Sequence, residues 1–139
     1  MAQLNEEQKA ELRQLAARYE LKGHHFHADR RGFIIVTRAG IEQIAGKLGV
    51  LYDLNPVLEW CDPDKGRYVI MCKAWMPLKE GQHAQVQSYG EVNAKNNSNV
   101  YPVAMAEKRA LSRCVLKLAG MYKLNVYGED EIPNETPTK

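Results

Sequence analysis

The sequence lacks the patterns that mark several large classes of protein. Its three cysteines, Cys61, Cys72 and Cys114, are widely spaced, and without a C-x-x-C pair neither a zinc ribbon nor a dithiol redox site is indicated. There is no P-loop, so ATP use is not expected. No apolar run is long enough for a membrane span, and the acidic N-terminus lacks the basic-then-apolar order of a secretory signal. These absences predict a cytoplasmic protein.

Catalytic groupings of acidic residues are also absent. A hydrolase or nuclease would need clustered carboxylates with a base nearby. Asp62 and Asp64 lie close together, but they share their segment with Pro63 and Gly66, which is ordinary turn composition. We therefore expect a protein that is not an enzyme and that uses no cofactor.

The histidines of "GHHFH" leave a metal site open as an alternative. His25 and His27 are two residues apart, so on a strand they would share a face and could bind one ion. Only Glu20 and Asp29 lie nearby as further acidic ligands. The other interpretation is that these histidines are polar residues of a hairpin, where their protonation would make affinity for DNA depend on pH.

The composition that is present suffices for one globular domain. Hydrophobic residues make up 45% and charged residues 26% of the 139 residues, which is typical of a folded chain with a single core. The chain has 19 basic and 17 acidic residues. The last twelve positions hold one of the basic and four of the acidic residues, so residues 1–127 carry a surplus of positive charge. We expect a core domain over 1–127 and a disordered acidic tail over 128–139, a pattern typical of proteins that bind polyanions.

Periodicity and turn signals predict an α+β fold. Asn5 is placed to cap a first helix that ends at Gly23, with Gln8 completing a capping box. Two short β-prone runs around "ADRRG" predict a hairpin, and "RAGIEQIAGKLGV" predicts a short helix. Residues 101–120 predict a long final helix with Pro102 in its first turn.

Three strands are predicted between the short and the long helix. The segments 51–60, 66–76 and 82–92 are β-prone, and the turns "CDPDKG" and "PLKEGQ" between them are short enough to require an antiparallel meander. One face of the middle strand is wholly apolar and should pack against the helices. The residues of this face are Tyr68, Ile70, Cys72, Ala74 and Met76. The predicted architecture is an antiparallel three-strand meander plus a basic hairpin, packed by an N-terminal helix, a short helix and a long C-terminal helix.

The long final helix carries a stripe of positive charge. Arg109, Arg113 and Lys117 are spaced i, i+4, i+8 along one border of its apolar arc, and Lys108 lies beyond the opposite border. Such a stripe matches a phosphate backbone lying alongside the helix. The alternative is a solvated face whose long side chains cover apolar surface. Glu107 is the only acidic residue of the helix, so the cations lack local partners, which favours the phosphate interpretation.

Three segments carry a family resemblance when they are taken in order. "FIIVTRAGIEQIAGKLGV" is similar to a strand and short helix, and "RYVIMCKAWMPLKEGQHAQVQSYGEV" to a strand, a Leu-Lys-acid-Gly turn, a strand and Tyr-Gly. "YPVAMAEKRALSRCVLKLAGMYKLNVYGEDE" is similar to a Lys-Arg-Ala-Leu helix followed by a small acidic segment. Together, over residues 10–132, they resemble the single-strand annealing proteins, the superfamily of eukaryotic Rad fifty-two and of the phage proteins RecT, Erf and Sak. In its small size the chain resembles the phage or prophage members of this superfamily.

The resemblance implies ATP-independent binding of single-stranded DNA and annealing of complementary strands in homologous recombination, by a homo-oligomeric ring or filament. It implies a DNA groove between the basic hairpin and the core that contains the final helix. A phage exonuclease or a host single-strand binding protein would be a partner in the bacterial cytoplasm. The predicted DNA-binding residues come from this resemblance and from the stripe of the final helix. They are Lys108, Arg109, Arg113, Lys117, Arg30, Arg31, Arg38, Lys79 and Lys95.

Aromatic residues are few near these basic elements, so we expect binding to be dominated by the DNA backbone rather than by base stacking. The aromatic residues concerned are Phe26, Phe33, Tyr89 and Tyr101. Replacing Lys108 and Arg109 with Ala is expected to weaken DNA binding and leave the fold intact. The alternative function is a protein-interaction module whose basic helix meets an acidic partner, or a general nucleic-acid-binding module without annealing activity.

Overall fold

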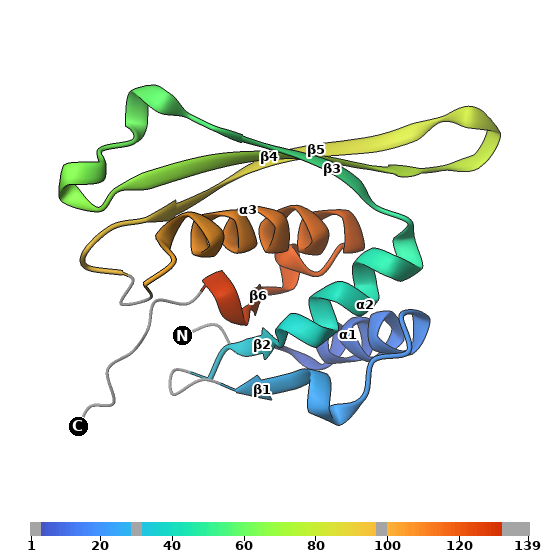
Figure 1. Ribbon diagram of the computed structural model, residues 1–139. Helices are drawn as coiled ribbons and strands as arrows, with labels where there is room; N and C mark the ends of the chain where they lie inside the picture. Colours follow the sequence, from blue (N-terminus) through green and yellow to red (C-terminus); the bar gives the residue numbers. More distant parts are fainter. Residues whose placement is uncertain (1–3, 29–31, 97–99, 132–139) are drawn as a thin grey trace.

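The computed structural model describes residues 4–28, 32–96 and 100–131, which form an α+β fold with two three-stranded sheets. The helices and strands follow in the order α1 (Glu6–Arg18), β1 (Phe26–Ala28), β2 (Ile34–Val36), α2 (Arg38–Leu48), β3 (Leu51–Pro56), β4 (Tyr68–Pro77), β5 (His83–Val92), α3 (Pro102–Ala119) and β6 (Val126–Gly128). Figure 1 shows the meander β3–β5 above α3 and the smaller sheet below it. The predicted fold class and order of elements are confirmed, and β6 is an addition to them.

The first helix begins as predicted but ends earlier. Asn5 and Gln8 each accept a hydrogen bond from the other's backbone N–H, which makes a complete capping box. The helix does not continue to Gly23, because Glu20 takes a left-handed conformation with φ 58°. Gln43 of α2 donates to the carbonyl oxygen of Glu20 at 2.9 Å, and so provides a partner for a backbone group that the helix end leaves free.

The meander packs one face on α3. β4 pairs antiparallel with both β3 and β5. Ile70, Cys72 and Ala74, at the centre of the face predicted to be apolar, are buried against the helix, which confirms that prediction. β5 approaches α3 closely at Gly90, where an added Cβ would overlap the backbone of Ala106. Glycine is therefore required at this contact.

The smaller sheet joins the hairpin to the C-terminal end of the described chain. β1 pairs antiparallel with β2, and β2 pairs parallel with β6. Regular structure continues past residue 127, where a domain boundary was predicted, because β6 extends to Gly128 and a short 3-10 turn follows over Glu129–Glu131. Glu131 is only 9% exposed, so residues 128–131 belong to the folded core. The rest of the predicted tail, 132–139, lies outside the described residues.

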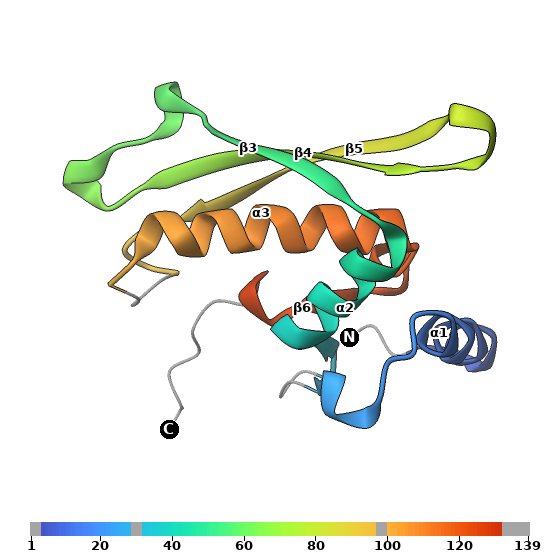
Figure 2. The same cartoon turned by 45° about the vertical axis from the view of Figure 1, so that its right-hand side comes forward.

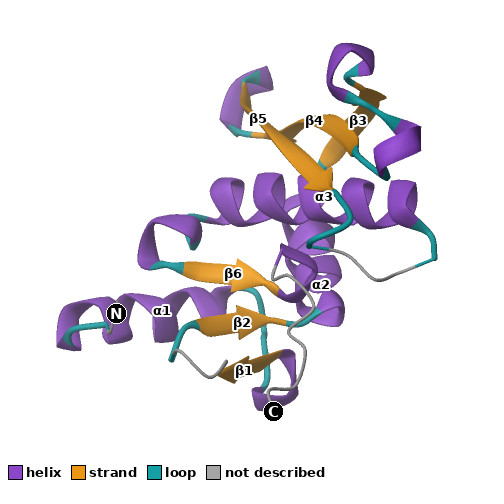
Figure 3. Cartoon of the chain, turned by 90° about the vertical axis from the view of Figure 1, so that its left-hand side faces the viewer, coloured by secondary structure: helices purple, strands orange, loops and turns teal. Residues whose placement is uncertain are grey.

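The largest hydrophobic cluster lies where α3 meets the other two helices and the smaller sheet. It includes Leu15 of α1, Ile44 of α2, Leu116 of α3, Val36 of β2 and Val126 of β6. Figures 2 and 3 show the meander on the opposite side of α3 from this sheet. Because α3 is covered from two sides, only part of its surface reaches solvent. No helix in the described ranges is long and apolar enough to cross a membrane.

Candidate nucleic-acid interface

The cations of α3 differ greatly in exposure. Lys108 and Lys117 are exposed, and the Arg113 side chain is 33% exposed. Arg109 is only 3% exposed. The stripe predicted from i, i+4, i+8 spacing is therefore not a uniform cationic surface, because neighbouring elements cover its first arginine.

Arg109 is an anchor inside the fold. Its guanidinium donates to the carbonyl oxygens of Asp130 (2.7 Å), Glu91 (2.8 Å) and Asn96 (2.8 Å), and to Oδ1 of Asn96 (3.1 Å). Burial, with the nearby charge of Arg113, lowers the pKa of Arg109, but a guanidinium remains protonated at neutral pH. Four of its five donors are engaged, so this side chain is unavailable to phosphate in this conformation. We now expect its removal to destabilise the fold, because Ala would leave several partly buried carbonyl oxygens without these partners.

The next two cations of the stripe reach across to β5. Arg113 donates from Nη1 to the carbonyl oxygen of Tyr89 at 2.6 Å and from Nε to Glu131 at 3.1 Å. Lys117 donates to the carbonyl oxygen of Gln87 at 3.3 Å. The inference that the cations lack partners is thus correct only within the helix, since the partners come from segments distant in sequence. The solvated-face alternative gains support at these positions.

Three consecutive acidic residues, Glu129–Glu131, lie against the arginines. Glu131 accepts from Arg113 and, at 2.7 Å, from the N–H of Gly128. Burial is the largest influence on this carboxyl and raises its pKa, although the bonds from Gly128 and Arg113 act in the opposite direction. Burial also raises the pKa of Asp130. The chain's own carboxylates therefore occupy part of the region predicted to be a DNA groove.

Arg38 begins α2 against the same acidic segment. Its backbone N–H donates to Glu129 at 2.6 Å, and its guanidinium pairs with Glu42 at 3.2 Å. The guanidinium also lies 3.5 Å from Asp130, an ion pair without hydrogen-bond geometry.

Lys108 lies close enough to lower the pKa of Asp130 against the effect of burial. Within the described ranges no hydrogen bond or ion pair engages the Lys108 ammonium, which leaves it free to bind a phosphate.

The remaining predicted cations are not gathered at one place. Lys79 lies in the turn between β4 and β5, and Lys95 lies in the turn after β5. The ten residues of β5 separate these turns, which corresponds to roughly 30 Å of extended chain. Arg30 and Arg31 lie outside the described residues. The structure thus brings Arg38, Lys108, Arg109 and Arg113 together around the acidic segment and leaves Lys79 and Lys95 apart from them.

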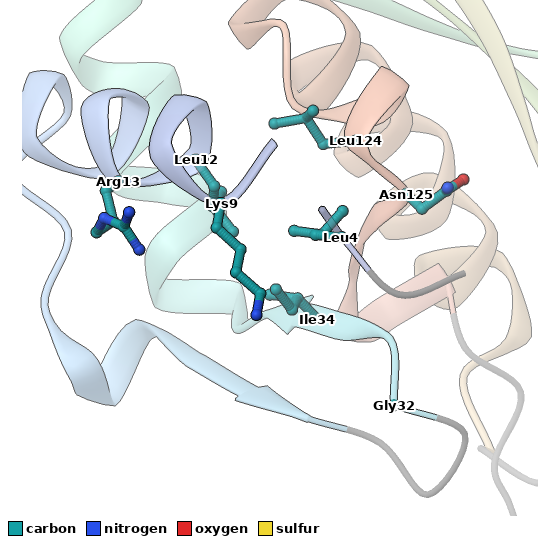
Figure 4. A pocket seen from close by; sticks show the side chains of 8 residues that line it. All are labelled: Leu4, Lys9, Leu12, Arg13, Gly32, Ile34, Leu124 and Asn125. Atoms are coloured by element: carbon teal, nitrogen blue, oxygen red, sulfur yellow. The ribbon is translucent and has the colours of Figure 1, made fainter. Parts of the chain in front are cut away.

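A hollow between α1 and the hairpin adds two cations that the sequence prediction did not include. It has a volume of about 390 Å³, and Lys9 and Arg13 line it together with apolar residues that include Leu12 and Ile34. Figure 4 shows Lys9 extending from α1 toward Ile34 of β2. The available signal was the i, i+4 spacing of the two cations on a predicted helix.

The histidines of the hairpin do not share an exposed face. His25 is buried, and its Nδ1 accepts from the N–H of Lys22 at 2.9 Å, whereas His27 is exposed. Burial lowers the pKa of His25, which keeps its imidazole neutral near pH 7. Within the described ranges no group of three or more His, Cys, Asp or Glu side chains could hold a metal ion.

No family model matches the chain, and no curated protein matches it. Function is therefore inferred from the chain's own fold, from the cations that reach its surface and from its exposed apolar side chains.

Proposed function

We propose that this protein binds single-stranded DNA and anneals complementary strands without ATP, as a homo-oligomer acting in homologous recombination. The observation that carries the proposal is the order of elements. Helix, hairpin, short helix, three-strand meander and long helix form in sequence, and the three segments that resemble annealing proteins lie on the elements from the hairpin onward. The basic surplus of residues 1–127 supports a polyanionic ligand.

Annealing breaks no covalent bond, so the protein must neutralise phosphates and leave bases exposed rather than supply catalytic groups. Each phosphate contact from Lys or Arg releases condensed counterions, and contacts to the backbone leave the bases free to sample a partner strand. Exposed cations on the helices that could make such contacts include Lys108 and Lys117 on α3 and Lys9 and Arg13 on α1. Arg109 has a different role, since its donors hold the fold together.

Exposed apolar side chains on two separate elements support an assembly. Leu51, at the start of β3, is 58% exposed, and Val103, in the first turn of α3, is 43% exposed. Exposed apolar side chains on two different elements would allow head-to-tail contact between subunits, which generates rings or filaments. Many weak sites along one DNA strand then add by avidity.

Annealing of two complementary labelled oligonucleotides by the purified protein, without nucleotide, tests the proposal. We expect faster annealing than in the absence of protein, together with an oligomer in light scattering of the same sample. A monomer that leaves the annealing rate unchanged would contradict the proposal and favour a protein-interaction module.

The salt dependence of binding tests the phosphate contact at Lys108. Because Lys108 is exposed on α3, Lys108→Ala should weaken binding of oligothymidylate and reduce the slope of log affinity against log salt by roughly 0.7. The measurement is fluorescence anisotropy at several salt concentrations. Lys47→Ala, which removes an exposed lysine of α2 paired with Glu20, is the matched control and should leave the slope unchanged. An equal slope in wild type and Lys108→Ala would remove this helix from the interface.

A further inference from the structure

An aromatic pair lies beside three cations at one end of the meander. The rings of Trp60 and Tyr89 are tilted with centroids 5.7 Å apart, and the two residues are 54% and 38% exposed. They line a hollow of about 760 Å³ together with Lys65, Arg67 and Lys95. We call this hollow the Trp60 pocket. The sequence prediction missed Trp60, which was placed at the end of an extended strand, whereas the chain turns there in a short 3-10 helix.

The Trp60 pocket lies on the face of the meander that points away from α3. Tyr89 is exposed and pairs with Met71 of β4, while its neighbours in β5, Ser88 and Gly90, are buried toward the helix. Strand residues alternate between faces, so the Tyr89 side chain points away from α3, whereas Arg109, Arg113 and Lys117 reach only backbone carbonyl oxygens of β5. The described residues that line the pocket include none of the acidic segment Glu129–Glu131.

Hydrogen bonds hold the turn that carries Lys95. Oδ1 of Asn93 accepts from the N–H of Lys95 at 2.8 Å and from the N–H of Asn96 at 3.0 Å. Asn96 is in turn bound by Arg109 through both its side chain and its carbonyl oxygen. Ordering this turn before a ligand arrives lowers the entropy cost of binding. Arg109 thus acts as a positioning residue for the cation at the edge of the pocket.

We infer that the Trp60 pocket binds single-stranded DNA by stacking a base on its aromatic pair while its cations contact the adjoining phosphates. Exposed aromatic rings beside cations are the combination by which proteins bind single strands without sequence preference. The lining also includes Glu59 and Glu91, so three cations and two carboxylates leave a net charge of +1. That small surplus favours a flat aromatic ligand with few phosphates over an acidic polypeptide. The inference depends on the proposed function and adds a stacking contact where only backbone contacts were expected.

Tryptophan fluorescence can report on this pocket directly. The chain has two tryptophans, so Trp75→Phe leaves Trp60 as the only one. Titration of this variant with oligothymidylate should quench its fluorescence in parallel with binding measured by the anisotropy of a labelled oligonucleotide. A base stacked on the indole would quench its emission, and substitutions of the two aromatic residues test whether that contact contributes to affinity.

Substitutions in the aromatic pair supply the second measurement. Trp60→Ala or Tyr89→Ala should weaken oligothymidylate binding by about tenfold or more, the range expected for loss of a stacked base. Tyr89→Phe keeps the ring and should bind as wild type does. Tyr52→Ala removes an exposed tyrosine of β3 outside the pocket, and it is the matched control that should leave affinity within twofold.

The outcomes separate this inference from the proposed function. Normal affinity in Trp60→Ala and Tyr89→Ala, without quenching of Trp60, would overturn the pocket and leave DNA binding intact. If wild type fails to bind oligothymidylate, both proposals are overturned. If Trp60→Ala dissociates the oligomer in light scattering while affinity per subunit is unchanged, the pocket is a contact between copies of the chain, and the inference is also overturned.

Discussion

Arg109 shows at the scale of one residue how a cation that suits DNA can instead serve the fold. Its four hydrogen bonds join the α3 backbone to β5, to the turn after β5 and to the acidic segment. Arg109→Ala should lower the free energy of unfolding by about 3 kcal/mol, since three partly buried carbonyl oxygens would each lose a hydrogen bond worth roughly 1 kcal/mol. Arg109→Lys should recover only part of this, because an ammonium lacks the fork of donors.

Urea denaturation measures this effect, with Lys108→Ala as the exposed neighbour for comparison. That control should change the free energy of unfolding by no more than about 0.5 kcal/mol. An Arg109→Ala protein as stable as wild type would show that the buried hydrogen bonds are not what holds the turn and the acidic segment in place.

The three cysteines should differ in reactivity. Cys72 and Cys114 are fully buried, and the Cys114 thiol donates to the Cys72 carbonyl oxygen at 3.3 Å. The interaction with Cys114, together with burial, raises the pKa of the Cys72 thiol, and the bond with Cys72 lowers the pKa of Cys114. Complete burial keeps a reagent from both thiols. A thiol reagent should therefore modify Cys61, which is partly exposed, before the other two, which should react only in denaturant. Rapid reaction of all three in the native protein would contradict this burial.

Helix periodicity correctly placed Arg109 at the border of the apolar arc, but it could not say whether that border is buried. The elements that cover Arg109 come from β5 and from residues after β6, and no local pattern in α3 predicts their arrival. Trp60 was missed for a related reason. Its β-prone neighbours suggested an extended strand, whereas β3 ends at Pro56 and the ring is turned toward Tyr89.

At the scale of elements, the contact between β5 and α3 depends on Gly90. Gly90→Ala would drive a methyl group into the backbone of Ala106, and backbone cannot move as a flexible side chain can. We expect a loss of about 3 kcal/mol or more in thermal or urea unfolding. Gly46→Ala on α2 is the matched control, because an added Cβ there meets nothing within 4 Å. It should stabilise by about 0.5–1 kcal/mol through the higher helix propensity of Ala. Equal effects of the two substitutions would contradict the close packing of β5 on α3.

The acidic turn after β6 should make stability depend on pH. Burial raises the pKa of Glu131 and of Asp130, so the folded state holds these protons more tightly than the unfolded state does. The free energy of unfolding should therefore fall as pH rises above about 4.3, the ordinary pKa of a glutamate, toward the raised pKa. Glu131→Gln removes the more deeply buried of the two carboxyl groups. It should reduce the loss of stability with rising pH to the part that is due to Asp130. The measurement is the free energy of unfolding by urea at several pH values between 4 and 7. The same dependence on pH in wild type and Glu131→Gln would contradict the burial of this carboxyl.

Most elements were predictable because their signals are local. The capping box of α1, Pro102 in the first turn of α3 and the two turns of the meander all depend on neighbouring residues. β6 was not predictable, since three residues show no periodicity and its parallel pairing with β2 joins segments about ninety positions apart. The predicted boundary at residue 127 followed from the same omission, because β6 and the hydrogen bonds from Arg109 and Arg113 hold residues 128–131 in the fold.

At the scale of the whole molecule, head-to-tail assembly requires two different surfaces on each subunit. Leu51, at the edge of the meander, and Val103, at the start of α3, are exposed on separate elements. In the proposed assembly, Leu51→Glu and Val103→Glu should each abolish the oligomer, because either change places a charge where an exposed apolar side chain would meet the next subunit. Mixing the two variants distinguishes this geometry from a two-fold dimer. The intact α3 patch of one variant can meet the intact β3 patch of the other, but neither partner can extend further. Light scattering should then show single variants as monomers and the mixture as dimers. A mixture that stays monomeric would mean that these patches do not face each other in the assembly.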